Sequence, residues 1–349
     1  MILQQSYSTA WESPSNIALV KYWGKFGRQY PSNPSISFTL SEAKSTLSMK
    51  VNPADSLSCR LEFHGQRETA FEDRILRFLE SIKQDYPWLE NATIDISSTN
   101  SFPHSAGIAS SASAMSALAL CLVDIDMQIH HKSWIDSPAF RQKASEVARL
   151  ASGSAARSVY PFLARWGVST ISNKGSNNYA DYAGNNVDPI FSDYKNSILI
   201  LSSATKSVSS SAGHRLMEDN RFASERFKQA NEHLEQLLMA MAQGDMAAFI
   251  RIVEEEALTL HALMMTSNPS YILMEPQTIE AIRAIRAFRQ ERNIPVCFTL
   301  DAGPNIHMLY PASYTSQVEP WRDTVLRPLC EEGRIIEDGV GQGPQRLSF

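Results

Sequence analysis

A serine-rich loop is the segment best suited to hold a phosphate group. It reads Phe102-Pro103-His104-Ser105-Ala106-Gly107-Ile108-Ala109-Ser110-Ser111-Ala112-Ser113. Small residues let the backbone approach an anion, and the serine hydroxyls can donate hydrogen bonds to it. The apolar run at 114–123 predicts a buried helix whose unpaired N–H groups and positive dipole end face the loop. No Gly-Lys-Ser/Thr follows, so this is not a Walker A motif. A Ser/Ala-rich turn that caps a core helix is the competing interpretation.

Two lysines lie beside the end of another apolar run. Lys21 and Lys25 follow residues 17–20 with Tyr22 between them, and Asn16 precedes the run. Cationic side chains at this spacing could contact a multiply charged phosphate. A surface lysine pair with buried aromatic neighbours would give the same pattern.

Arg157 belongs to the segment Ser152-Gly153-Ser154-Ala155-Ala156-Arg157-Ser158. Ser152 or Ser154 is a natural helix N-cap, which would place Arg157 in the first turn. A cation there opposes the helix dipole and needs an anionic partner, which a carboxylate gripped in a bidentate manner would supply. An ordinary capped helix with a solvated arginine is an equally good interpretation.

Asp301 ends the apolar segment at 296–300 and precedes Ala302-Gly303-Pro304-Asn305. A carboxylate at the end of a buried strand could act as a base, although an Asx-type turn would also place an aspartate there. A donor-rich loop at 206–214 adds a weaker signal. Phosphate donors, a carboxylate-binding arginine and a possible base together suit phosphoryl transfer to a small acidic substrate.

The elements that must position these residues follow from hydrophobic periodicity. Strands are expected at 17–20, 35–40, 45–51, 57–63, 92–96, 166–171, 197–201, 296–300 and 334–337. Helices are expected at 71–82, at 140–162 with a break at 152–154, and at 221–243, 246–265, 278–291 and 318–330. Strands and helices come in groups, which predicts an α+β protein. The polar stretch at 173–193 is the expected crossing between two lobes.

Composition excludes several classes of protein. The 349 residues are 43% hydrophobic and 20% charged, with a net charge of −5, which does not favour nucleic-acid binding. The apolar run at 114–123 is too short to span a bilayer and is closed by Asp124 and Asp126, so no membrane partner is expected. The four cysteines are far apart without metal-binding spacing, which predicts a reducing, cytoplasmic location.

Six blocks of the chain resemble, in order, those of the GHMP kinase superfamily, and within it the mevalonate diphosphate decarboxylase family. They are residues 16–25 (NIALVKYWGK), 33–40, the serine loop at 102–113, SGSAARS at 152–158, 208–213 and DAGPN at 301–305. The blocks span nearly the whole chain. The resemblance implies a two-lobed GHMP kinase fold with its active site in the cleft. A ribosomal protein S5 domain 2-like lobe is expected at 1–190 and an α/β lobe at 191–349, with two copies forming a homodimer.

The resemblance also implies an activity, namely ATP-dependent conversion of mevalonate 5-diphosphate to isopentenyl diphosphate with release of ADP, phosphate and CO2. In that interpretation Asp301 deprotonates the 3-hydroxyl of the substrate, Arg157 grips its carboxylate, and Asn16 and Lys21 order the reacting groups. The remaining substrate contacts would come from Tyr22, Lys25, Ser152, Gly153, Ser154, Ser209 and Ser210. ATP, with Mg²⁺, would be held by Ser105, Ala106, Gly107, Ala109, Ser110, Ser111 and Ser113.

Two positions depart from the pattern of some family members. Ser211 stands where some have arginine or threonine, and His214 where some have methionine. Loss of a cation near the phosphate tail would favour a mevalonate 5-phosphate decarboxylase, while retention of Tyr22 and Lys25 favours the diphosphate. A GHMP kinase that does not decarboxylate is a further alternative. A protein that only binds nucleotide is disfavoured, because it would not need the base.

Overall fold

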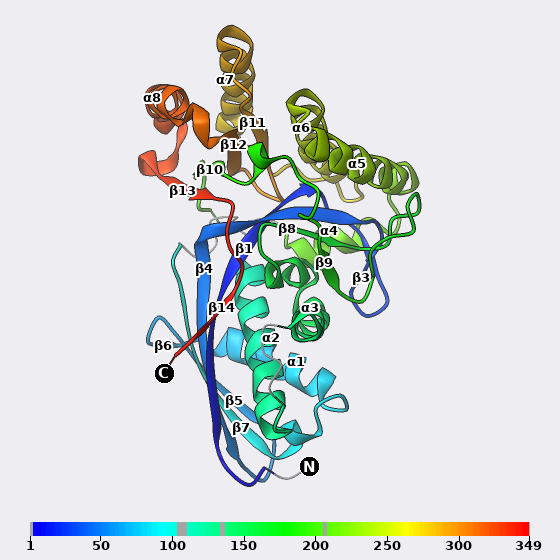
Figure 1. Ribbon diagram of the computed structural model, residues 1–349, viewed down its shortest axis with the longest axis vertical. Helices are drawn as coiled ribbons and strands as arrows, with labels where there is room; N and C mark the ends of the chain where they lie inside the picture. Colours follow the sequence, from blue (N-terminus) through cyan, green and yellow to red (C-terminus); the bar gives the residue numbers. More distant parts are fainter. Residues whose placement is uncertain (1–2, 103–109, 133–136, 205–207, 349) are drawn as a thin grey trace.

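The computed structural model describes residues 3–102, 110–132, 137–204 and 208–348. Four of the expected ATP-binding residues, namely Ser105, Ala106, Gly107 and Ala109, lie outside these ranges. The described chain forms two regions of mixed helix and sheet (Figure 1), which confirms the expected α+β class. The lower region in that view holds the larger sheet and the upper region a smaller one.

The larger sheet has eight described strands and is covered on one face by helices (Figure 1). Its main path runs in the order β14-β1-β4-β7-β5-β6, and β8 and β9 extend it from β4. The strands are β1 (Tyr7–Val20), β4 (Ser35–Pro53), β5 (Ser58–Phe63), β6 (Gln66–Arg67), β7 (Ala92–Asn100), β8 (Leu163–Trp166), β9 (Ala180–Tyr182) and β14 (Gln345–Leu347). The covering helices are α1 (Thr69–Ile82), α2 (Ser110–Ile129) and α3 (Pro138–Ala151). A small hairpin pairs β2 (Lys25–Phe26) with β3 (Tyr30–Pro31).

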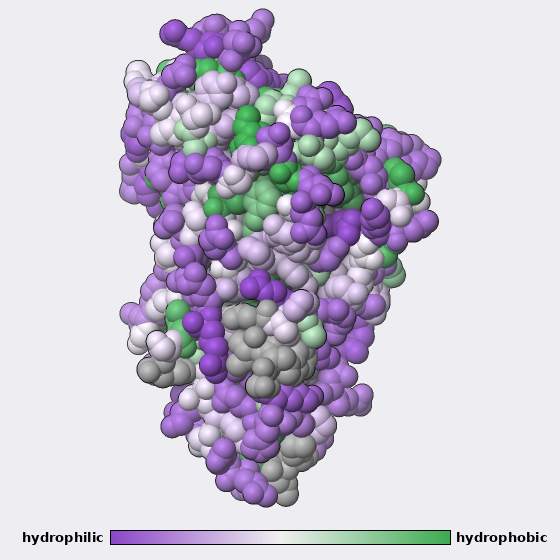
Figure 2. All heavy atoms as spheres, in the orientation of Figure 1, coloured by the Kyte–Doolittle hydropathy of each residue, from purple (hydrophilic) through white to green (hydrophobic). Residues whose placement is uncertain are grey.

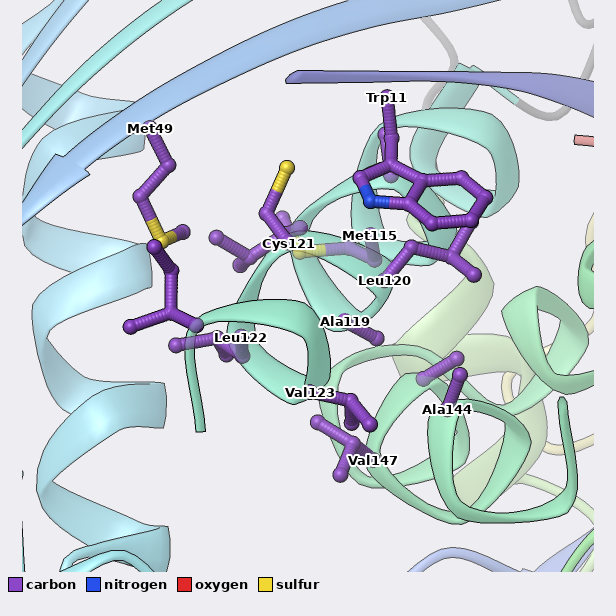
Figure 3. Close-up of a cluster of buried hydrophobic side chains, with 14 of the residues drawn as sticks. Trp11, Met49, Met115, Ala119, Leu120, Cys121, Leu122, Val123, Ala144 and Val147 are labelled. Carbon is purple, nitrogen blue, oxygen red and sulfur yellow. The ribbon is translucent and has the colours of Figure 1, made fainter. Parts of the chain in front are cut away.

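Helix α2 is the centre of the larger region and is longer than its apolar run predicted. Its alanines and leucines pack between the sheet and α3 (Figure 3). Trp11 of β1 stacks on Phe140 of α3, with ring centroids 5.4 Å apart. Residues 111–129 form a helix long and apolar enough to span a membrane, but most of this helix is buried inside the protein. Asp124 on this helix is also buried and accepts hydrogen bonds from Trp11 and Arg346. These contacts are those of a core helix, and hydrophilic residues dominate the surface in view (Figure 2).

The smaller sheet has the order β11-β12-β10-β13, formed by β10 (Tyr194–Leu199), β11 (Cys297–Thr299), β12 (Ile306–Pro311) and β13 (Ile335–Gly339). Its helices are α4 (Ser210–Arg215), α5 (Ala223–Gln243), α6 (Met246–Met265), α7 (Pro276–Arg292) and α8 (Thr315–Val325). One hydrophobic cluster contains Ile17 and Phe38 of the larger sheet together with Leu234 of α5 and Phe249 of α6. The two regions therefore share a core where they meet.

Several sequence expectations were wrong in their bounds. The strand expected at 166–171 ends at Trp166, because Gly167 turns the chain with a φ of 99°. The second helix of the 140–162 stretch is a short 3₁₀ segment, η2 (Gly153–Val159). The helix expected at 318–330 is α8 (Thr315–Val325), and Pro328 lies in the short 3₁₀ segment η5 (Arg327–Leu329) that follows it. The strand β14, near the C-terminal end of the chain, pairs with β1 in the larger sheet, and the division into lobes at 1–190 and 191–349 stays a prediction.

The two strands expected at 35–40 and 45–51 form one strand, β4, with a bulge between them. At the bulge the carboxylate of Asp338 accepts hydrogen bonds from the backbone N–H groups of Ser41, Glu42 and Ala43 at 2.8–2.9 Å. The side chain thus replaces the ladder hydrogen bonds that the bulge removes. This contact ties β13 of the smaller sheet to β4 of the larger one.

Candidate active site

A cavity of about 310 Å³ lies where the two regions meet. Lys21 and Tyr22 enter it directly after β1, and Asp301 lies two residues after the end of β11. The other predicted site residues on its wall are Lys25, Ser111, Ser152, Gly153, Ser154, Arg157, Ser209 and Ser210. The structure therefore brings residues from opposite ends of the chain into one space.

An ion pair joins Lys21 and Asp301. The distance between Lys21 Nζ and Asp301 Oδ1 is 2.8 Å, and the ammonium also donates to the carbonyl oxygen of Ala18 at 2.7 Å. The Lys21 side chain is 2% exposed, whereas Asp301 keeps 32% of its side-chain surface accessible. Burial acts to raise the pKa of Asp301, but the cationic groups around it, chiefly the Lys21 ammonium, together hold this pKa below its usual value. Asp301 is thus an ionised carboxylate that borders the cavity at neutral pH.

Arg157 is a buried cation without a carboxylate partner among the described residues. Its guanidinium donates to the hydroxyls of Ser35 at 2.6 Å and Ser37 at 3.0 Å, and to Asn16 Oδ1 at 3.3 Å. Burial lowers the pKa of Arg157 to about 10, which leaves it charged at neutral pH. Asn16 lies behind the arginine, where it also donates to Ser158, so it can orient Arg157 without facing the cavity. A buried, charged guanidinium on a cavity wall favours an anionic ligand.

Gly153 allows Tyr22 to pack closely against the turn before η2. A Cβ atom at this position would lie 2.8 Å from the Tyr22 hydroxyl oxygen and 3.0 Å from the Trp166 ring. Tyr22 also packs on Trp166, with ring centroids 4.7 Å apart. The absence of a side chain at 153 therefore sets where Tyr22 lies in the cavity.

We expect Gly153→Ala to displace Tyr22 and to raise the KM for the acidic substrate about tenfold or more, since overpacking typically costs about 1–3 kcal/mol. The KM for nucleotide should change little. Steady-state kinetics with each ligand varied in turn would measure both, with thermal unfolding as a control for stability. An unchanged substrate KM would show that the position of Tyr22 does not matter to binding.

His214 serves packing rather than anion binding. Its Nδ1 accepts a hydrogen bond from the Gly24 N–H at 3.0 Å, and its ring lies 4.3 Å from that of Tyr22 and 4.6 Å from that of Trp23. Burial lowers the pKa of His214 to about 3, so the ring is neutral. The neighbouring Ser209 caps α4 by accepting from the Ala212 N–H at 3.2 Å.

The buried histidines predict a loss of stability in mild acid. Burial lowers the pKa of His214 to about 3 and that of His307 to about 4. In the unfolded chain both return to an ordinary value of about 6.5, so the unfolded state binds more protons below that pH. The free energy of unfolding should therefore fall by about 2 kcal/mol per histidine between pH 7 and pH 5. Urea unfolding at the two pH values would measure this, and His307→Gln should remove about half of the loss; equal stability at both would contradict the account.

The N-terminus of α2 reaches the cavity through Ser111. Ser110 opens the same helix. Ser113, which was expected to bind ATP, is fully buried, and its hydroxyl oxygen lies 2.7 Å from that of Ser45. Two residues along α2 from Ser111, the Ser113 side chain therefore faces Ser45 of the sheet, and its role in binding ATP stays a prediction.

A second cavity of about 230 Å³ adjoins the first. Its walls are mostly apolar, with Phe63, Phe71 and Leu118 among them, and the amide of Asn100 adds a polar group. Arg74 and Ser111 line both cavities. Sequence reasoning missed Arg74, because an arginine on an amphipathic surface helix gives no signal that separates it from a solvated one.

The two halves of the chain match two sequence families. Residues 13–180 match the diphosphomevalonate decarboxylase-like N-terminal domain, and residues 197–332 match the mevalonate 5-diphosphate decarboxylase C-terminal domain. The chain belongs to the mevalonate diphosphate decarboxylase family. This confirms the resemblance on which the expected fold and site residues were based.

Full-length relatives agree with this membership. A diphosphomevalonate decarboxylase from Candida albicans is 26% identical over 98% of each chain. A crystal structure of mevalonate diphosphate decarboxylase from Staphylococcus aureus is 25% identical, covers 100% of each chain and has a TM-score of 0.84. A structure of MDDEF in complex with MVAPP, AMPPCP and magnesium is 24% identical, covers 99% of this chain and 100% of its own, and has a TM-score of 0.82. The two-lobed fold of the family is therefore the fold of this chain.

Proposed function

We propose that this protein catalyses the ATP-dependent decarboxylation of mevalonate 5-diphosphate, which yields isopentenyl diphosphate, ADP, phosphate and CO2. The observation that carries the proposal is the pairing of two features in one cavity. Asp301 supplies an ionised carboxylate 2.8 Å from Lys21 Nζ, and Arg157 supplies a buried cation without a carboxylate partner among the described residues. A substrate with both a hydroxyl group and a carboxylate satisfies both features.

The nucleotide is proposed to span the two cavities. The N-terminus of α2, with Ser111 on the cavity wall, favours phosphate oxygens near the first cavity, and the apolar second cavity suits a purine base. Arg74 lies between the two positions, where it can contact phosphates. The structure of MDDEF with AMPPCP and magnesium supports ATP and Mg²⁺ as ligands. Mg²⁺ bound chiefly through phosphates needs few protein ligands, and among the described residues no group of three or more acidic, His or Cys side chains could hold a metal ion.

In the first step the 3-hydroxyl oxygen of the substrate attacks the γ-phosphorus of ATP. The bond from that phosphorus to the bridging oxygen breaks, ADP leaves, and the hydroxyl proton passes to the Asp301 carboxylate. Lys21 holds the carboxylate ionised and in place. Little basicity is required, because the transition state for phosphoryl transfer is loose and positioning supplies most of the catalysis.

In the second step the new phosphate group leaves with the electron pair of its bond to C3. Positive charge develops at C3, and the electrons of the bond between the carboxylate and C2 form the new double bond as CO2 departs. Arg157 orients the carboxylate for this loss, and the buried hydroxyls of Ser35 and Ser37 hold its guanidinium. Preorganised charges in a site that excludes water are what such a reaction requires.

The phosphate tail of the substrate is assigned to another part of the cavity wall. Tyr22, Lys25, Ser152 and Ser210 line it, and Lys25 Nζ already donates to Gln29 at 2.7 Å. His214 is neutral, so the cationic contact in this wall comes from Lys25. The family to which the chain belongs favours the diphosphate over the monophosphate substrate.

The test is an ADP-release assay with mevalonate 5-diphosphate and mevalonate 5-phosphate in parallel, with CO2 trapped. Turnover with CO2 on the diphosphate supports the proposal. Preference for the monophosphate would keep the chemistry and change the substrate, whereas ADP without CO2 would make the protein a kinase.

A cytoplasmic location remains a prediction from the cysteine pattern, and a homodimer remains a prediction from the resemblance. Light scattering would test the homodimer.

A further inference from the structure

A buried acid on α6, Glu256, holds the backbone of Lys21. Its Oε2 atom accepts the Lys21 N–H at 2.8 Å, and its carboxylate forms two hydrogen bonds with Arg226, at 2.5 and 2.6 Å. Arg226 also donates to the carbonyl oxygen of Lys21 at 3.1 Å, and His233 Nδ1 lies 2.7 Å from Glu256. The Arg226 and Glu256 side chains are 1% and 0% exposed. Both backbone polar groups of Lys21 are thus tied to one buried ion pair.

The same helix also holds the backbone of Asp301. His261, five positions after Glu256, lies with its Nε2 atom 3.1 Å from the carbonyl oxygen of Asp301. A carbonyl oxygen only accepts, so this nitrogen carries the hydrogen and donates it. His261 is 1% exposed, and its neighbour Leu260 lines the cavity. The contact lies next to the cavity but does not enter it.

One rigid helix therefore contacts both partners of the Lys21–Asp301 pair through their backbones. Asp301 follows β11 in a segment without regular secondary structure, so no sheet hydrogen bonds set its position. Lys21 likewise lies just past the end of β1. The distance between the two side chains then depends on α6, and catalytic groups lose about 100-fold in rate when displaced by about 1 Å.

We propose that His261 is a positioning residue that sets Asp301 against Lys21, with Glu256 fixing Lys21 from the same helix. The proposal rests on the function proposed above. If His261 only fills the core, removing its N–H should lower the stability of the fold and leave kcat unchanged.

Three variants test the inference. His261→Leu keeps the bulk but removes the donor, and His261→Gln offers an amide N–H that reaches the same carbonyl. Thr266→Val perturbs the C-terminal end of α6 without touching Lys21 or Asp301, since the Thr266 hydroxyl donates to the carbonyl oxygen of Ala262 at 2.8 Å. We expect His261→Leu to lower kcat about 10- to 100-fold with the KM for ATP unchanged. His261→Gln should recover most of the loss, and Thr266→Val should behave like the wild type.

A readout independent of activity is the pH titration of the Asp301 carboxyl group by carbon-13 NMR, assigned by its loss in Asp301→Asn and followed over the pH range in which circular dichroism shows that each variant is folded. The charged or titratable groups that act on this carboxyl are Lys21, His307 and Arg157. In His261→Leu the carboxylate should move away from Lys21, so its pKa should rise toward the ordinary value of about 3.9 and return in His261→Gln.

Two results would overturn the inference. One is an Asp301 pKa in His261→Leu that equals that of the wild type. The other is a loss of kcat that is equal in the leucine and glutamine variants and that parallels their loss of thermal stability. Absence of CO2 release by the wild type would instead overturn the proposed function. The titration tests whether His261 positions Asp301 whether or not the wild type releases CO2.

Discussion

Replacing Asp301 with asparagine should lower kcat about 10³- to 10⁴-fold while ATP still binds. The amide keeps the shape of the side chain and can accept a hydrogen bond from Lys21, but it cannot take the proton of the 3-hydroxyl. It also leaves the ammonium of Lys21 buried beside a neutral group, where the wild type has an ion pair of 2.8 Å. Both effects act on the transition state for phosphoryl transfer rather than on nucleotide binding.

Single-turnover kinetics would measure the loss, and calorimetric titration with a non-hydrolysable ATP analogue would measure nucleotide affinity. Asp301→Glu is the matched control, because it keeps the carboxylate but moves it by one methylene group; we expect it to retain more activity than asparagine. Near wild-type turnover in Asp301→Asn would contradict the role of Asp301 as the proton acceptor for the 3-hydroxyl group.

Arg157→Ala is expected to weaken substrate binding about 10- to 100-fold and to reduce turnover, with ATP affinity retained. The truncation removes the only group here that we assign to the substrate carboxylate, and charge-assisted hydrogen bonds of this kind are worth about 1.5–3 kcal/mol. It also leaves the hydroxyls of Ser35 and Ser37 without their donor.

Arg157→Lys separates these effects, because it keeps the charge but cannot reproduce the planar fork. We expect it to bind substrate better than the alanine variant while remaining slow. Substrate affinity can be measured by the KM and nucleotide affinity by titration. A loss of ATP affinity in both variants as large as their loss of substrate affinity would contradict the assignment of Arg157 to the substrate carboxylate.

Helices with clear local signals were predictable from the sequence. α6 has the predicted bounds, Met246–Met265, because Asp245 caps it by accepting the Ala248 N–H at 3.0 Å. α5 ends where expected, at Gly244, whose φ of 68° is typical of a helix terminus. By contrast, β12 was missed because all six of its residues are buried, so it shows no alternation of polar and apolar side chains.

The candidate site was predictable in its residue types and not in its geometry. The types at Lys21, Arg157 and Asp301 indicated the chemistry, but the ion pair joins residues 280 positions apart, which no local pattern reveals. Ser113 carried the same local signal as Ser111, and only the helical rotation of α2 separates the buried hydroxyl from the one that lines the cavity. Glu256 and His261 gave no signal, because they act on backbone groups.

The most direct test of the central claim follows the 3-hydroxyl oxygen of the substrate. Mevalonate 5-diphosphate labelled with oxygen-18 at that hydroxyl is converted with ATP, and the released inorganic phosphate is analysed by mass spectrometry. Transfer of the γ-phosphoryl group to this oxygen, followed by its loss from C3, predicts labelled phosphate together with equal amounts of ADP and CO2. Unlabelled phosphate would mean that ATP is hydrolysed without phosphorylation of the substrate, which would contradict the roles proposed for Asp301 and Lys21.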